Sequence, residues 1–392
     1  MSDSFTETTT KSWTSRIGES IKGVLFGLAL VVGSCVFLFW NEGRAVQTAR
    51  SLTEGASIIV AADPARVDPA NEGKLVHLSG DIKVAAPLVD PDFTVSATAI
   101  RLVRTVEMYQ WKEERRTETR RTSGGGEETI TTYEYVRTWS DHRINSSGFR
   151  QREGHANPEM RYSGRALIAG DATLGAYRPG NNVLQRLPAE QVVPLDPALA
   201  EKLRGHIGGR VHVADGRIFL GENPSRPLIG DLRISFKIAP PGPASIIGRQ
   251  AGADFSDYQT EAGDRLLLVR AGTHSAADMF SAAQWENRIL TWMLRLAGVL
   301  AMAFGFFLIL NPLVVVADIV PFLGGVLSAG AGIVSLLLTA IIAPLVIAIA
   351  WFWYRPLVSA IVLAIGLAAA YGFRQWASRK AATRATVRPA TT

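Results

Sequence analysis

Four long apolar segments, one near the N-terminus and three near the C-terminus, constrain this chain more than any other feature. The first, residues 23–40, carries no charge, and as a helix it would be about 27 Å long, close to the hydrocarbon thickness of a bilayer. The others cover residues 291–316, 322–353 and 357–373. We therefore expect four transmembrane helices, with a water-exposed domain at residues 41–290 between the first and the second.

The intervening domain is predicted to be rich in β-strands. Strand-like stretches of β-branched and aromatic residues, bounded by Gly, Pro, Asp and Asn, recur along it. They cover residues 74–84, 99–111, 129–139, 161–167, 209–220 and 228–238. Helices are expected at residues 196–206 and 275–287. The expected fold class is therefore an α+β membrane protein whose four spans carry one β-rich domain.

Basic residues flank the outermost spans, and such flanks mark the cytoplasmic side of a membrane. They are Lys11, Arg16, Lys22, Arg374, Arg379, Lys380, Arg384 and Arg388. We therefore expect residues 1–22 and 374–392 in the cytoplasm and the large domain outside it, in a periplasm or a lumen. Because these flanks explain much of the net charge of +6, the charge does not indicate nucleic-acid binding. Arginine is far more frequent than lysine, which favours a bacterial inner membrane as the location.

The segment before the first span has a helical apolar pattern, in which Trp13, Ile17 and Ile21 recur at every fourth position. Two interpretations fit this pattern equally. One is a short amphipathic helix on the membrane surface, and the other is a helical extension of the first span.

No motif for catalysis, a cofactor or a metal is present. The six histidines are scattered without an i, i+4 pair, and there is no phosphate-binding glycine loop and no Gly-x-Ser-x-Gly sequence. The single cysteine, Cys35, lies inside the first apolar run, so no intramolecular disulfide can form. We expect a protein that is not an enzyme.

The strongest candidate positions lie where the first apolar run ends, at Asn41, Glu42 and Arg44. Glu42 and Arg44 either pair with each other or anchor the chain to lipid headgroups. The simpler interpretation is an ordinary polar flank of a span.

Small residues form a second group of candidates, because they allow helices to approach closely. Gly23 and Gly27 are four residues apart in the first run, and Gly324, Ser328 and Gly332 repeat at the same spacing in the third. The pattern leaves open whether these faces pack within one chain or between two.

Asp318 is the third candidate, because an acid inside a membrane segment is a functional hypothesis by default. It lies either in a proton or ion site or in an interfacial loop, since Asn311, Pro312 and Pro321 bracket it.

The chain resembles the transmembrane protein 43 (LUMA) family over nearly its whole length. The residues that carry the resemblance are Phe39 to Ala45, Leu75 to Ile82, Val106 to Trp111, Thr132 to Tyr135, Ile229 to Phe236 and Asn311 to Leu313. The resemblance implies a multipass protein with cytosolic termini and a large lumenal domain. In animals it implies the endoplasmic reticulum and inner nuclear membrane, with partners such as emerin and lamins, which a bacterial member would lack. It implies no catalytic residue.

Together these features predict a non-enzymatic membrane scaffold. We expect it to contact membrane lipids, to associate with itself and with other membrane proteins, and to bind no nucleic acid. The alternative is a transport or channel-associated subunit with its ion or proton site near Asp318.

Overall fold

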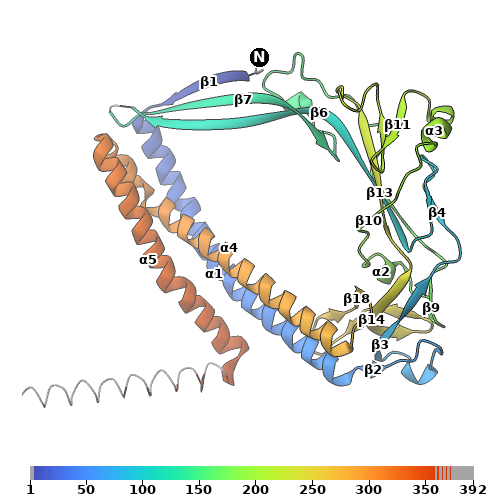
Figure 1. The fold of residues 1–392 in the computed structure, drawn as a ribbon. Coiled ribbons are helices and arrows are strands. Elements are labelled where there is room, and N and C mark those ends of the chain that lie inside the picture. Colours follow the sequence, from blue (N-terminus) through green and yellow to red (C-terminus); the bar gives the residue numbers. More distant parts are fainter. Residues whose placement is uncertain are drawn as a thin grey trace, which may run out of the picture. The chain divides into compact units, whose positions relative to one another are not determined.

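The computed structural model describes residues 4–122 and 124–357, together with residues 360, 361, 364, 368 and 371. The chain divides into two compact units, traced in Figure 1. We call residues 4–11, 50–122 and 127–284 the β-rich unit, and residues 12–49, 124–126 and 285 onward the helical unit.

Three long helices are present in the described part of the chain: α1 (Trp13–Ile58), α4 (Ala276–Ala317) and α5 (Pro321–Tyr354). Each is long and apolar enough to cross a membrane. They contain the spans predicted at residues 23–40, 291–316 and 322–353, which confirms three of the four expected helices. The fourth, expected at residues 357–373, lies largely outside the described residues, as does the tail at 374–392.

The first and second spans belong to helices that are much longer than the spans themselves. Helix α1 begins at Trp13, so residues 13–22 extend the span and are not a separate surface helix. It ends only at Ile58, because residues 41–58 contain no proline and are mostly good helix formers. Likewise, the helix expected at residues 275–287 is the first part of α4. After α1, regular β-structure therefore begins only beyond Ile58 and not at residue 41.

The larger sheet of the β-rich unit has eight strands. Its main path is β1 (Ser4–Lys11), β7 (Glu127–Ser140), β6 (Arg101–Arg121), β13 (Leu232–Ala239), β12 (Arg217–Leu220) and β11 (Val211–Ala214), while β10 (Gln191–Val192) pairs with β13 and β8 (Arg165–Ile168) with β6. Every pairing in this sheet is antiparallel.

The smaller sheet has six strands. Its main path is β15 (Asp254–Ser256), β14 (Gly242–Ala251), β3 (Leu75–Lys83) and β2 (Val60–Ala61), while β18 (Leu268–Ala271) pairs with β14 and β9 (Thr173–Leu174) with β3. Two short ladders, β4 (Leu88–Val89) with β5 (Ser96–Ala97) and β16 (Tyr258–Gln259) with β17 (Arg265–Leu266), complete the strands. The short helices are α2 (Asn181–Leu184), α3 (Leu199–Ile207) and the 3₁₀ turns Pro69–Asn71 and Ser146–Gly148.

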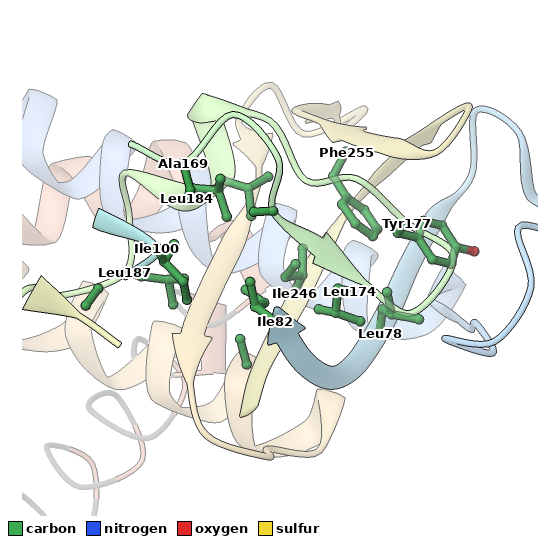
Figure 2. Packing of buried hydrophobic residues seen from close by; sticks show 14 of the residues in the cluster. Leu78, Ile82, Ile100, Ala169, Leu174, Tyr177, Leu184, Leu187, Ile246 and Phe255 are labelled. Atoms are coloured by element: carbon green, nitrogen blue, oxygen red, sulfur yellow. The ribbon is translucent and has the colours of Figure 1, made fainter. Parts of the chain in front are cut away.

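Alternating apolar residues build the core of each sheet, as the two-residue period of a strand requires. In the smaller sheet, Leu78 and Ile82 of β3 pack with Ile246 of β14, and Tyr177 stacks on Phe255 at 5.2 Å between ring centroids (Figure 2). A second cluster lies on the larger sheet and has the same alternation. The prediction of a β-rich domain is therefore confirmed.

Strand β1 was not expected, because residues 1–22 were interpreted as a cytoplasmic segment. Residues 4–11 instead pair with β7 of the β-rich unit along their whole length. The ring of Phe5 lies 6.2 Å from that of Tyr133, and Glu7 pairs with Arg150 at 2.6 Å. A crossing of the membrane by α1 would separate β1 from β7, so this pairing and the expected placement of residues 4–11 across the membrane from the large domain make different predictions.

The pairing predicts a specific cross-link. Thr8 lies opposite Ile130, so a Thr8→Cys, Ile130→Cys variant should form a disulfide under mild oxidation, because directly opposed strand residues have suitable Cβ separation. Changing Cys35 to serine removes the only native thiol. Non-reducing electrophoresis after proteolysis between the two positions would detect the bond.

The matched control is Thr8→Cys with Thr132→Cys, which lies two residues out of register and should cross-link much less. If neither pair cross-links and impermeant reagents label positions 8 and 130 from opposite faces of the membrane, the pairing is wrong. A single crossing by α1 would then separate the two strands, as the basic flanks predict.

Candidate functional site

Small residues bring the three long helices together. A Cβ atom on Gly27 of α1 would lie 2.6 Å from the backbone oxygen of Gly305 in α4, and one on Gly298 would lie 2.7 Å from the side chain of Leu38. Leu38, Met302 and Ala343 form a buried apolar cluster with one residue from each helix. Helices α1 and α4 are therefore antiparallel neighbours, and α5 packs with both.

At one end of this bundle, polar side chains from all three helices meet in the interior. We call this group the polar cluster; its members are Asn41, Glu42, Arg44, Asn287, Thr291, Arg295 and Trp351. Asn41 is fully buried and Glu42 is 2% exposed. The cluster contains all three residues predicted at the end of the first apolar run.

A charged pair joins α1 to α4 in this cluster. The Nε and Nη2 atoms of Arg295 donate to the two carboxylate oxygens of Glu42 at 2.6 and 2.7 Å. The indole N–H of Trp351 on α5 donates to the same carboxylate at 2.8 Å. The Arg295 guanidinium also lies 4.6 Å from the ring centroid of Trp292. Such bidentate, charge-assisted geometry is the strong form of an ion pair.

Amide and hydroxyl groups add a second set of bonds between α1 and α4. Arg44 donates to the side-chain oxygens of Asn287 and Thr291, both at 3.0 Å. The Asn287 amide donates to the backbone oxygen of Ala45 at 3.0 Å, and the Asn41 amide donates to that of Thr291 at 3.2 Å. These bonds satisfy polar groups that would otherwise be costly to bury.

Gly43, which lies between Glu42 and Arg44, allows α5 to approach α1 closely. A Cβ on Gly43 would lie 2.6 Å from the ring of Tyr354, and the same ring lies 5.3 Å from that of Phe39. The run from Phe39 to Ala45 is therefore used almost entirely for contacts between helices. Trp40 is the exception, because it is 53% exposed.

The predicted pairing of Glu42 with Arg44 is not formed. Residues two apart on a helix point in different directions, and α1 continues through both, so Glu42 faces Arg295 while Arg44 faces Asn287. Sequence reasoning did not identify Arg295 as the partner of Glu42.

Asp318 lies in the turn between α4 and α5 and is fully buried. Its carboxylate pairs with Arg16 of α1 at 2.7 Å. Arg16 also donates to the backbone oxygen of Gly125 at 2.6 Å, and the indole of Trp13 donates to that of Val315 at 2.9 Å. The structure thus places Asp318 in an ion pair between elements of the helical unit.

The small-residue candidates have different environments. Gly27 is at the close approach to Gly305, and a Cβ on Gly324 would collide with the carboxylate of Asp318. A Cβ on Gly23 or Gly332 would meet no atom within 4 Å, and Ser328 is half-buried. A side chain at Gly23 or Gly332 would therefore pack against no other element of the described chain, whereas one at Gly298 or Gly305, which sequence reasoning missed, would.

This difference predicts that two similar substitutions have different effects on the stability of the helical unit. Gly27→Ala should destabilise the helical unit by about 1–3 kcal/mol, because the added methyl meets backbone that has no room to move. Gly23→Ala should be neutral or slightly stabilising, because alanine favours a helix and the space is open. Thermal unfolding in one detergent would compare the two. Equal effects would show that α1 and α4 do not approach closely at Gly27.

Comparisons with known proteins agree with this architecture. The family model described as Transmembrane protein 43 matches residues 108–356. Transmembrane protein 43 of Mus musculus is 32% identical over 368 residues, covering 90% of this chain and 89% of the mouse protein. That of Homo sapiens is 32% identical over 370 residues, with the same coverage. A homolog from Drosophila melanogaster is 31% identical over 351 residues, covering 87% of this chain and 91% of the fly protein. No solved structure matches the chain.

The three apolar helices, joined through a buried polar cluster and combined with a β-rich unit, define a multipass membrane protein. The chain belongs to the transmembrane protein 43 family. The resemblance noted from the sequence is therefore confirmed. These relatives are animal proteins, so they give no support to the expected bacterial source.

Proposed function

We propose that this protein is a non-enzymatic membrane scaffold. Its helices form a preassembled anchor, and its β-rich unit presents surfaces to other membrane proteins or to lipid. We further propose that it associates with itself and that the β-rich unit lies outside the cytoplasm, which the basic residues after the last apolar run support.

The observation that carries the proposal is that the buried Glu42 carboxylate of the polar cluster is bonded by side chains of two other helices. Both oxygens of Glu42 accept hydrogen bonds from Arg295 or Trp351. A transport site keeps polar groups available for a passing ion or substrate, whereas these groups hold helices together. The cluster therefore favours an architectural role over transport.

The ion pair of Asp318 also favours a scaffold over a transport subunit. A carboxylate that binds a translocated cation must exchange partners, yet Asp318 faces the guanidinium of Arg16 at 2.7 Å in a buried setting. We therefore favour the scaffold over a transport subunit with an ion site near Asp318.

Native mass spectrometry of the intact protein, released from its membrane under mild conditions, tests the scaffold. We expect a defined oligomer that retains lipid. A lipid-free monomer would contradict the proposal. The matched control is a Val32→Ala variant, because Val32 is 57% exposed on α1 and its change should leave the subunit number unaltered.

A flux assay tests the competing function directly. In sealed liposomes with an imposed ion or proton gradient, the scaffold should show no flux above protein-free vesicles. Flux that is lost in an Asp318→Asn variant would overturn the scaffold in favour of transport.

A further inference from the structure

Large aromatic side chains are exposed around the end of the bundle that holds the polar cluster. Trp40 of α1 is 53% exposed, Trp292 of α4 is 62% exposed and Trp353 of α5 is 74% exposed. Trp285, farther along α4, is also exposed, at 60%. A buried indole needs no special explanation, but exposed tryptophans at one end of three different helices do.

Contacts inside the cluster show that these tryptophans lie at one level along the bundle. Glu42 bonds to both Arg295 and Trp351, so these three positions are level. Trp40, Trp292 and Trp353 are each two or three residues from a member of that set. The exposed indoles therefore form a belt around the bundle and not a stripe along it.

The surface of the bundle differs on the two sides of this belt. On one side the exposed residues are apolar, including Val36 and Val32 on α1, Leu296 on α4 and Ile349 on α5. On the other side α1 exposes Gln47, and α4 exposes Glu286 beside the apolar residues Trp285, Ile289 and Leu290. The belt thus marks a change from an apolar surface to one on which charged and polar side chains are also exposed.

Two exposed cations lie at the same end. Arg288 is four residues from Trp292 on α4, and Arg355 follows Trp353 at the end of α5. Tryptophan and basic residues are enriched together at membrane interfaces, where indoles sit among the headgroups and cations face the phosphates.

We propose that this belt lies in the headgroup interface of a phospholipid bilayer. Trp40, Trp292 and Trp353 mark the boundary, the Glu42–Arg295 pair lies at the edge of the hydrocarbon, and α1 and α4 continue beyond it into water. A phospholipid surface fits because a belt on three helices, flanked by cations on one side and aliphatic residues on the other, matches the polarity profile of a bilayer. This inference does not depend on the scaffold role.

Spin-label accessibility in liposomes of phosphatidylcholine and phosphatidylglycerol tests the boundary. Single cysteines are placed at outward positions in a Cys35→Ser background. They are Gln47→Cys, Val36→Cys and Val32→Cys on α1, Glu286→Cys, Leu296→Cys and Leu300→Cys on α4, and Arg355→Cys, Ile349→Cys and Leu345→Cys at α5. Access to a water-soluble nickel complex and to oxygen is measured for each.

We expect nickel access at positions 47, 286 and 355 and its loss at the other six, with oxygen access rising with depth. On each helix the inner position (36, 296 or 349) is compared with the outer one (47, 286 or 355). Equal nickel access at the two positions of any helix would overturn the boundary. Loss of both nickel and oxygen access at the inner positions would also overturn it, because a protein partner and not lipid would then cover the belt. All these side chains point outward, so each variant should remain folded. Gel filtration of each variant checks this.

Discussion

Replacement of Glu42 by alanine is expected to lower the free energy of unfolding of the helical unit by about 3–5 kcal/mol. The substitution removes the partner of a guanidinium that is only 15% exposed, and breaking a buried pair from one side leaves an uncompensated charge. It also leaves the indole N–H of Trp351 without its acceptor. Thermal unfolding of the purified protein in one detergent, followed by circular dichroism, would measure the loss.

Glu42→Gln provides the graded control for this result. Glutamine keeps the length of the side chain and an oxygen acceptor but removes the charge, so its effect should lie between those of the wild type and alanine. A loss below about 1 kcal/mol for Glu42→Ala would show that the pair is solvated like a surface ion pair and does not hold the bundle.

The second large effect is expected in the β-rich unit, where Arg104→Ala should cost about 3–5 kcal/mol. Arg104 is 5% exposed and donates to both oxygens of Asp90, at 2.9 and 3.0 Å, and to Asp92 at 2.6 Å. It also donates twice to the backbone oxygen of Ser163. Because Asp90 is itself 1% exposed, removing the cation leaves a buried carboxylate without its counter-charge.

Arg165→Ala is the matched control, since Arg165 lies opposite Arg104 across the β6–β8 ladder but is exposed. Its effect should stay within about 0.5 kcal/mol, as for most surface substitutions. Urea unfolding of the whole protein in detergent would compare the two variants. Similar losses for both would mean that the buried network around Arg104 contributes little.

The transmembrane helices were predictable because hydrophobicity alone identifies them. Their ends were not, since residues 41–58 are polar enough to suggest a loop yet have the propensity of a helix. A polar sequence next to a span indicates where the membrane ends, and it does not indicate where the helix ends.

Strands with clear alternation, such as β3 and β13, were also predictable. Strand β14 was missed, although it is central in the smaller sheet, because it begins with Gly242 and Pro243, which usually mark a turn. Strand β1 was missed because its serine and threonine residues show no apolar alternation. Its place depends on the distant strand β7, which no local pattern reveals.

The candidate site was predicted in part. Asn41, Glu42 and Arg44 stand out as polar residues at the end of an apolar run, and the structure brings all three into the polar cluster. Their partners Asn287, Arg295 and Trp351 lie more than 240 positions away in the sequence. Only the antiparallel packing of α1 and α4 and the approach of α5 bring them together.

A double-mutant cycle between Glu42 and Arg295 tests the central claim most directly. The single variants Glu42→Met and Arg295→Met and the double variant are unfolded under one set of conditions. If the pair holds the bundle, each single change should cost several kcal/mol and the double variant much less than their sum, giving a coupling energy of about 2 kcal/mol or more. Additive losses, with a coupling below about 0.5 kcal/mol, would contradict the account.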